Sequence, residues 1–293
     1  IIRPQFGGYF IQIVNFMSEE NDANQYVHTP VRLFQLKPCI CFEGRIHEQV
    51  LPSIKALDLP CATLGNATLY HYGYQPTAMK EKGKLDRTVT MLEREVEESP
   101  NDAFQWFNLA NAYSVGKMPE KAAFAAHQAV RLMDNDAPYG SLTYQILSSA
   151  LLAQGLGDEA IQACDEASQR GLATIITHFE RAHALYRKRE FATALASINK
   201  AISLDWPDGM TGDIGIKTHK AHVLKGQILT ELGQLEEAKE CIQFALQVDP
   251  TFTLAQFAAG CLARARGELV EAQAIFEKLV DDPQLGGTCQ RLL

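Results

Sequence analysis

The second half of this chain repeats itself, and the repeat restricts its fold more than any other feature. Small residues recur inside apolar helical patterns at spacings of 38, 34, 44 and 34 residues, at Ala122, Ala160, Ala194, Ala238 and Ala272. A small side chain lets two helices cross closely. One helix pair cannot bury its apolar face alone, so neighbouring pairs must stack. The spacing therefore predicts a mainly α fold in which about five helix pairs form a solenoid.

One copy of the repeat indicates its type. Trp106, Leu109, Ala110 and Tyr113, followed by Ala122, resemble the tetratricopeptide pattern W-x-x-L-G-x-x-Y…A. This resemblance implies a solenoid over residues 100–293 that binds a protein or peptide on its concave face, which the first helix of each repeat lines. The repeat register places these residues near that face: Phe104, Phe107, Asn111, Gln145, Ser149, Phe179, His183, Tyr186, Lys220, Gln227 and Arg264. Phe104 and Phe107 have an alternative role, which is packing between repeats.

The 44-residue spacing leaves residues 204–216 as an enlarged loop between the third and fourth repeats. Its sequence, L-D-W-P-D-G-M-T-G-D-I-G-I, contains the proline and glycines that end helices. Two interpretations stay open for this loop, a binding loop and a tolerated insertion.

Charge and cysteine content narrow the function classes. The net charge of −8 falls wholly in residues 81–293, which carry 21 basic and 29 acidic residues. An acidic surface repels phosphates, so we expect no nucleic-acid partner. No apolar run is long enough for a transmembrane helix. The seven cysteines are an odd number without a C-x-x-C motif, which favours free thiols in a reducing cytoplasm.

The first 80 residues lack the helical period. Residues 9–16, 26–36, 39–46 and 67–72 are rich in β-branched and aromatic residues and read as strands. Residues 48–57 read as a short helix, and residues 81–99 as a helix that leads into the repeats. The sequence thus predicts a small α/β unit over residues 1–80, a connecting helix over 81–99 and the solenoid over 100–293.

Four motifs in the α/β unit resemble a known family. G-Y-F at 8–10, V-H-T-P-V-R-L-F at 27–34, F-E-G-R-I-H-E-Q at 42–49 and Y-H-Y-G-Y at 70–74 run in the order found in bacterial family-2 glycosyltransferases. In one subgroup of that family, an A-type catalytic domain is followed by tetratricopeptide repeats. The resemblance covers only the last part of that catalytic domain, so the unit would be its α/β remnant.

The resemblance implies sugar transfer from a nucleotide sugar, with Mn²⁺ or Mg²⁺ on the diphosphate of the full-length enzyme. His47 and Glu48 resemble the family's acidic catalytic motif, beside Arg45. His71 resembles its late metal-ligating histidine, and Arg32 would contact phosphate. Alternatives stay open for each residue. Glu48 would favour a helix start, His47 would be an orienting residue, His71 a half-buried structural histidine, and Arg32 a member of an ion pair.

The nucleotide-binding half and its D-x-D motif are absent from these residues, so we expect no cofactor in this chain itself. Two functions follow. The first is the C-terminal portion of a glycosyltransferase whose repeats bind a protein or peptide. The alternative is a non-catalytic interaction scaffold with a vestigial catalytic segment. Bare strand edges also predict a homodimer through residues 1–80.

Overall fold

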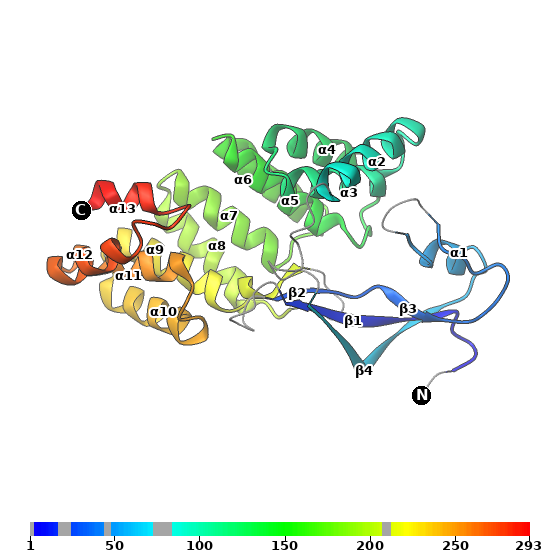
Figure 1. Ribbon diagram of the computed structural model, residues 1–293, viewed down its shortest axis with the longest axis horizontal. Coiled ribbons are helices and arrows are strands. Elements are labelled where there is room, and N and C mark those ends of the chain that lie inside the picture. The colour runs from blue at the N-terminus through cyan, green and yellow to red at the C-terminus, as the bar shows by residue number, and fades with distance from the viewer. Residues whose placement is uncertain (1–2, 17–24, 44–47, 73–83, 207–211) are drawn as a thin grey trace. The chain divides into compact units, whose positions relative to one another are not determined.

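The computed structural model describes residues 3–16, 25–43, 48–72, 84–206 and 212–293. The fold is mainly helical, with a small sheet near the N-terminus (Figure 1). This confirms the predicted fold class of a helical repeat array preceded by a small α/β segment. The chain forms two compact units, residues 1–154 with 206–213, and residues 155–205 with 214–293. The domain boundaries at residues 80 and 99 stay a prediction.

The sheet belongs to the first unit and is built around its first strand. Its strands are β1 (Gly8–Phe16), β2 (Gln25–His28), β3 (Val31–Phe34), β4 (Cys61–His71) and β5 (Gly212–Asp213). β1 pairs antiparallel with β2 and β3 and parallel with β4, while β5 pairs antiparallel with β2. The helix α1 (Leu51–Lys55) packs Ile54 against Val31 in the core of this sheet.

The predicted strand over residues 26–36 is two strands. Pro30 separates β2 from β3, and it has no N–H to donate to a ladder. Its carbonyl still accepts a hydrogen bond from the Ile11 N–H at 3.0 Å. Both strands therefore remain paired with β1 across an irregularity between Tyr9 and Phe10.

The predicted strand over residues 39–46 is wrong in its described part, residues 39–43, which form a turn and an isolated bridge from Glu43 to Gln49. The reason is that the Ser53 hydroxyl accepts a hydrogen bond from the Cys41 N–H at 3.1 Å and donates one to the Cys41 carbonyl at 2.8 Å. A side chain thus satisfies the backbone groups that a neighbouring strand would satisfy in a ladder.

The enlarged loop between the third and fourth repeats contributes to the sheet. Its residues 212–213 form β5, in which Asp213 pairs with Tyr26 and Gly212 with Val27. Trp206 packs against the buried cluster of Val14, Phe16 and Val27. The loop therefore completes the core on one side of the sheet, a role that neither sequence interpretation included.

We expect Trp206→Ala to weaken the sheet by about 1–3 kcal/mol, less than a fully buried tryptophan because the ring is half-exposed. Hydrogen exchange of the β1 and β2 amides should accelerate accordingly. Asp205→Ala, an exposed neighbour in the same loop, is the control and should change nothing. Unchanged exchange in the Trp206 variant would contradict the packing role.

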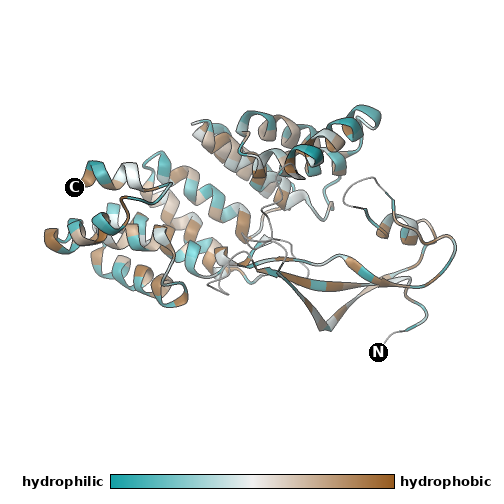
Figure 2. Ribbon diagram, viewed as in Figure 1, coloured by the Kyte–Doolittle hydropathy of each residue, from teal (hydrophilic) through white to brown (hydrophobic). Residues whose placement is uncertain are grey.

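The first and second helices of the repeats alternate along the chain. In the first unit they are α2 (Lys84–Glu98), α3 (Ala103–Val115), α4 (Pro119–Leu132) and α5 (Gly140–Ala153). In the second unit they are α6 (Gly157–Gln169), α7 (Ile175–Arg187), α8 (Phe191–Ser203), the short η1 (Ile214–Ile216), α9 (His219–Glu231), α10 (Leu235–Val248), α11 (Thr253–Ala265), α12 (Leu269–Lys278) and α13 (Gly286–Leu292). These helices carry both apolar and polar positions, as the mixed colours of Figure 2 show.

Small residues occupy the helix crossings. The five alanines that define the repeat are at most 3% exposed. The first helices carry a second small series, which the sequence analysis missed, with the same spacings: Ala110, Ser148, Ala182, Gly226 and Gly260. A Cβ on Gly226 would lie 3.3 Å from the carbonyl oxygen of Ala238. The two helices of that repeat thus cross where both series have their small residues.

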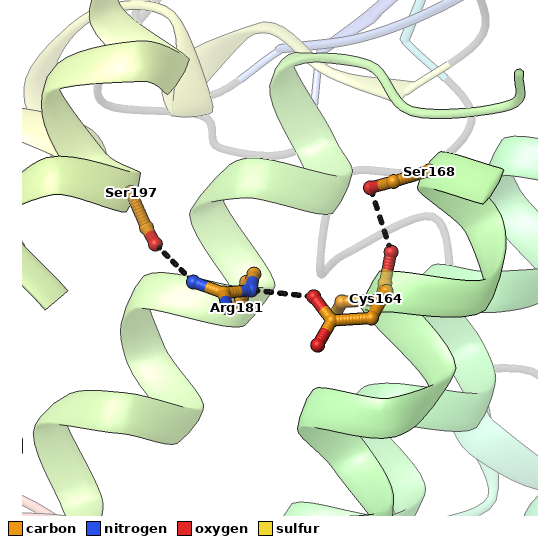
Figure 3. Close-up of polar contacts among 5 residues, drawn as sticks. Cys164, Ser168, Arg181 and Ser197 are labelled. Carbon is orange, nitrogen blue, oxygen red and sulfur yellow. Dashed lines mark hydrogen bonds and ion pairs between the residues drawn. The ribbon is translucent and has the colours of Figure 1, made fainter. Parts of the chain in front are cut away.

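One arginine connects three helices of the second unit (Figure 3). Arg181 on α7 donates from Nε to Asp165 on α6 at 2.7 Å and from a terminal nitrogen to Ser197 on α8 at 2.8 Å. The Arg181 side chain is only 26% exposed, so its hydrogen bonds are partly shielded from water. These contacts link the first three helices of this unit.

Candidate functional site

Three helices of the second unit form a groove where residues predicted from the sequence meet. Tyr186 on α7, Gln227 on α9 and Arg264 on α11 line one cavity of about 240 Å³. We call it the α7–α9–α11 groove. Its other lining residues are Thr230, Glu231, Phe257, Ala258, Cys261 and Ala265. The first helices of successive repeats thus supply one surface, because stacking places equivalent positions side by side.

The groove combines neutral and charged groups. Burial raises the pKa of Tyr186 to about 12, with Glu231 adding to the shift, so the phenol is a neutral hydroxyl at pH 7. Burial likewise raises the pKa of the Cys261 thiol to about 11. This thiol is therefore not a nucleophile at neutral pH. Glu231 faces Arg189 at 4.0 Å, whereas Arg264 has no ion pair among the described residues. Such a surface suits noncovalent binding.

The remaining residues predicted for the concave face lie outside this groove. Gln145 on α5, His183 on α7 and Lys220 on α9 are half-buried. Burial lowers the pKa of His183, and the positive charge of Arg187 lowers it further. The ring is therefore neutral at pH 7.

His183 makes a pH dependence of stability testable. Its folded-state pKa lies below the ordinary value of about 6.5, so the unfolded chain takes up a proton first as the pH falls. The second unit should lose stability as the pH drops below about 6.5, until the folded pKa is passed. We expect His183→Gln to reduce the fall in melting temperature between pH 7 and pH 5. The exposed His127→Gln is the control, and an unchanged slope in the His183 variant would contradict the prediction.

The first unit contains a second cavity, of about 300 Å³. Asn111, Phe104 and Phe107, all predicted for the concave face, line it from α3. The Phe107 ring stacks on Tyr139, with centroids 5.1 Å apart. Phe104 and Tyr139 also line an adjoining cavity of about 530 Å³. We call these two spaces the aromatic cavity. Phe104 and Phe107 therefore pack against Tyr139, which precedes α5, and also line the cavity. Their role in peptide binding stays a prediction.

Strand residues reach the same cavity. Asn15, which is fully buried on β1, donates from Nδ2 to the Tyr26 carbonyl at 2.8 Å and contacts His28 Nδ1 at 2.9 Å. Its Oδ1 lies 2.8 Å from Nδ1 of His71. Asn15 thus connects β2 to β4. Burial, then the charges of Arg32 and His71, lower the pKa of His28, so His28 is neutral at pH 7.

The structure brings together only part of the predicted catalytic set. Arg45 and His47 lie outside the described residues. Glu48 is exposed, and it precedes the first turn of α1, so the described geometry does not support the helix-start alternative. Arg32 is exposed on β3 and has no ion pair among the described residues. His71 pairs with an amide at the exposed end of β4.

Sequence reasoning missed several lining residues. Phe257 and Cys261 lie seven and three residues before Arg264 on the same helix face, so the helical period alone indicates them. No such period links Gln49 or Asn15 to α3, because strand and repeat residues meet only through the tertiary fold.

Comparisons with known proteins agree with the helical array. Residues 219–252 match the tetratricopeptide repeat family model. The solved structure of pilF from Pseudomonas aeruginosa is 15% identical, covers 72% of this chain and 91% of that chain, and has a TM-score of 0.52. The helical array has a tetratricopeptide-like fold. The Cut9–Hcn1 hetero-tetramer of the APC/C gives a TM-score of 0.56 at 14% identity, over 72% of this chain and 40% of that chain.

YrrB, whose structure is described as a TPR protein with an unusual peptide-binding site, is 19% identical over 69% of this chain and 99% of its own, with a TM-score of 0.46. No curated protein sequence is significantly similar to the chain. None of these comparisons supports the glycosyltransferase resemblance of residues 1–80. In the part of the chain that the structure describes, no helix is both long and apolar enough to cross a membrane.

Proposed function

We propose that this tetratricopeptide array binds a peptide segment of a partner protein in the α7–α9–α11 groove. The observation that carries the proposal is that Tyr186, Gln227 and Arg264, from three successive repeats, line one cavity. An extended peptide presents amides and side chains along its length, and a groove built from repeated positions contacts it at several points.

The chemistry of the groove indicates what the peptide carries. Arg264 offers a guanidinium that forms no ion pair among the described residues, so a carboxylate or a carbonyl of the peptide would be its partner. Phe257 supplies an apolar contact, and the Gln227 amide and the neutral Tyr186 hydroxyl supply hydrogen bonds. The proposed ligand is therefore a mixed polar and apolar segment with an acceptor opposite Arg264.

The test is selection of peptides from a displayed library, followed by affinity measurement on variants. We expect Arg264→Ala to weaken the selected peptides about tenfold, because a charge-assisted hydrogen bond is lost. Tyr186→Ala should have an effect in the same direction. Lys278→Ala removes an exposed cation from α12 and should leave affinity unchanged. Failure to select any peptide, or equal binding by all variants, would overturn the proposal.

A second candidate is that the array belongs to a longer glycosyltransferase. The favouring observation is that β3, which holds V-R-L-F, and the end of β4, which holds Tyr70 and His71, flank β1 on opposite sides. The metal that the resemblance implies does not fit the described residues. They hold no group of three His, Cys, Asp or Glu side chains that could ligate an ion, and His71 contacts Asn15. We therefore derive no catalytic step from it.

Calorimetric titration with uridine and guanosine diphosphate sugars in the presence of Mn²⁺ tests this second candidate. Saturable binding that His71→Ala abolishes would support the resemblance. A folded chain that binds neither donor would leave peptide binding as the function of these residues.

The exposed edge of the sheet supports a homodimer as part of the proposal. Among the described residues, β4 pairs only with β1, and it exposes Leu69 and Tyr70 by 48% and 64%. Unpaired strand edges recruit further strands. We expect sedimentation velocity at high concentration to show a dimer that Leu69→Lys weakens. A strictly monomeric profile would contradict this part.

A further inference from the structure

The larger space of the aromatic cavity has apolar walls. Phe104 of α3 and Tyr139, which precedes α5, line it with ring centroids 5.3 Å apart. Leu51 and Pro52 of α1 line it as well. Its volume of about 530 Å³ lies within the range of about 300–1,000 Å³ that is usual for ligand pockets. A ligand with an apolar stem would bury that stem here, which favours binding in proportion to the area removed from water.

Carboxylates outnumber basic groups around this space. The described residues that line it include three acids and one base, namely Glu43, Glu95, Asp102 and Lys55. Burial raises the pKa of Tyr139 to about 12, and the negative charges of Asp102 and Asp134 add to the shift. The phenol is therefore neutral at pH 7, and the charge near the rings is negative. Such surroundings repel an anion and attract a cation.

Backbone hydrogen bonds hold two of these acids at the wall of the space. Asp102 is the N-cap of α3, and its Oδ1 accepts hydrogen bonds from the N–H groups of Phe104 at 2.9 Å and Gln105 at 3.3 Å. Glu43 exchanges two backbone hydrogen bonds of 2.9 Å with Gln49. The positions of both acids are thus set before a ligand arrives, which lowers the entropy cost of binding.

Aromatic rings beside carboxylates favour one kind of cation. A guanidinium is planar and weakly hydrated, so it stacks on rings and pairs with carboxylates more readily than a compact ammonium does. We infer that the larger space of the aromatic cavity binds an arginine side chain of a peptide segment. The guanidinium lies against the Phe104 and Tyr139 rings and donates hydrogen bonds to Asp102. Its methylene stem packs on Leu51 and Pro52.

The adjoining smaller space supports a peptide as the source of the guanidinium. Its lining includes the neutral polar side chains of Thr29, Gln49 and Asn111, which offer donors and acceptors to backbone amides. Gln49 lines both spaces, so the amides next to an inserted arginine would lie at this polar edge. The inference goes beyond the proposed function, which concerns the groove of the second unit.

The probe is N-acetyl-argininamide, which carries one guanidinium and two amides. Its uncharged counterpart of nearly equal size, N-acetyl-citrullinamide, is compared with it by calorimetry and saturation-transfer NMR on the full chain at low salt. We expect the arginine probe to bind at least about tenfold more tightly, because only a cation pairs with the carboxylates. Butylguanidinium, which lacks the amides, should bind more weakly than the arginine probe. Equal or tighter binding of butylguanidinium would contradict a peptide as the source.

The decisive variants are Asp102→Asn and Tyr139→Leu. Asparagine caps a helix about as well as aspartate does, so Asp102→Asn should keep the melting temperature while it weakens the arginine probe about fivefold. Tyr139→Leu keeps an apolar wall but removes a ring, and it should weaken the probe about threefold. Glu97→Gln removes the same charge at an exposed position on α2, and this matched control should leave binding unchanged.

Equal binding of the arginine and citrulline probes, no binding of the arginine probe, or equal losses in the Asp102 and Glu97 variants would each overturn the inference. Arg264→Ala separates this failure from that of the proposed function, because it changes only the α7–α9–α11 groove and should leave the arginine probe unaffected. If selected peptides depend on Arg264 while the arginine probe does not bind, only the inference fails. If the probe binds and no selected peptide depends on Arg264, only the proposed function fails.

Discussion

Phe276→Ala is expected to lower the free energy of unfolding of the second unit by about 3–5 kcal/mol, the usual cost of deleting a buried aromatic ring. Phe276 on α12 is 1% exposed, and its ring centroid lies 5.7 Å from that of Phe257 on α11. It also packs with Leu279 and Cys289, so it joins the last repeat to α13. Alanine would leave a cavity that helices on both sides cannot close.

Thermal and urea unfolding would measure this loss. Phe244→Ala is the control, because that ring is 41% exposed on α10 and loses less buried area. If the Phe276 and Phe244 variants had the same melting temperature, the last repeat would not be packed as described. Peptide affinity would also fall in the Phe276 variant, since Phe257 lines the α7–α9–α11 groove.

Gly226→Leu is expected to cost about 3 kcal/mol, the upper end of overpacking penalties. A Cβ at Gly226 would lie 2.6 Å from Cγ1 of Ile242, and 3.3 Å from the backbone oxygen of Ala238. The side chain of Ile242 is 2% exposed and belongs to the buried cluster of α9, α10 and α11, so displacing it disturbs that packing. α9 and α10 would have to separate, which would weaken the contacts of the fourth repeat with its neighbours.

The matched control is Gly287→Leu on α13, where an added Cβ meets no atom within 4 Å. The free energy of unfolding of this variant should lie within about 0.5 kcal/mol of that of the unchanged protein. Equal stability of the two variants would contradict the close crossing of α9 and α10.

Local sequence patterns could place residues on the first helices of the repeats. Tyr186, Gln227 and Arg264 are predicted for the concave face from the repeat register, and these three line one groove. That they bind a peptide stays a prediction. Glu231 was missed, since its place in the groove depends on how α7, α9 and α11 stack. The predicted strand at residues 39–46 is wrong over residues 39–43, because the Ser53 hydroxyl, twelve residues from Cys41, satisfies the Cys41 backbone.

The sequence by itself determined the helical repeats, because small residues at a fixed period permit close helix crossings and leave apolar faces that only stacking can bury. Only the tertiary structure decided where strand residues and helix residues, which follow different sequence periods, lie next to one another. Gly212 and Asp213, in the loop after α8, form a strand of the N-terminal sheet because they pair with backbone groups of β2. Asn108 and Gln105 look like ordinary helix residues in the sequence. Only packing reveals that both are buried and that Asn108 Nδ2 and Gln105 Oε1 form no hydrogen bond among the described residues. Burial and hydrogen-bond satisfaction depend on neighbours distant in the chain, which no local pattern contains.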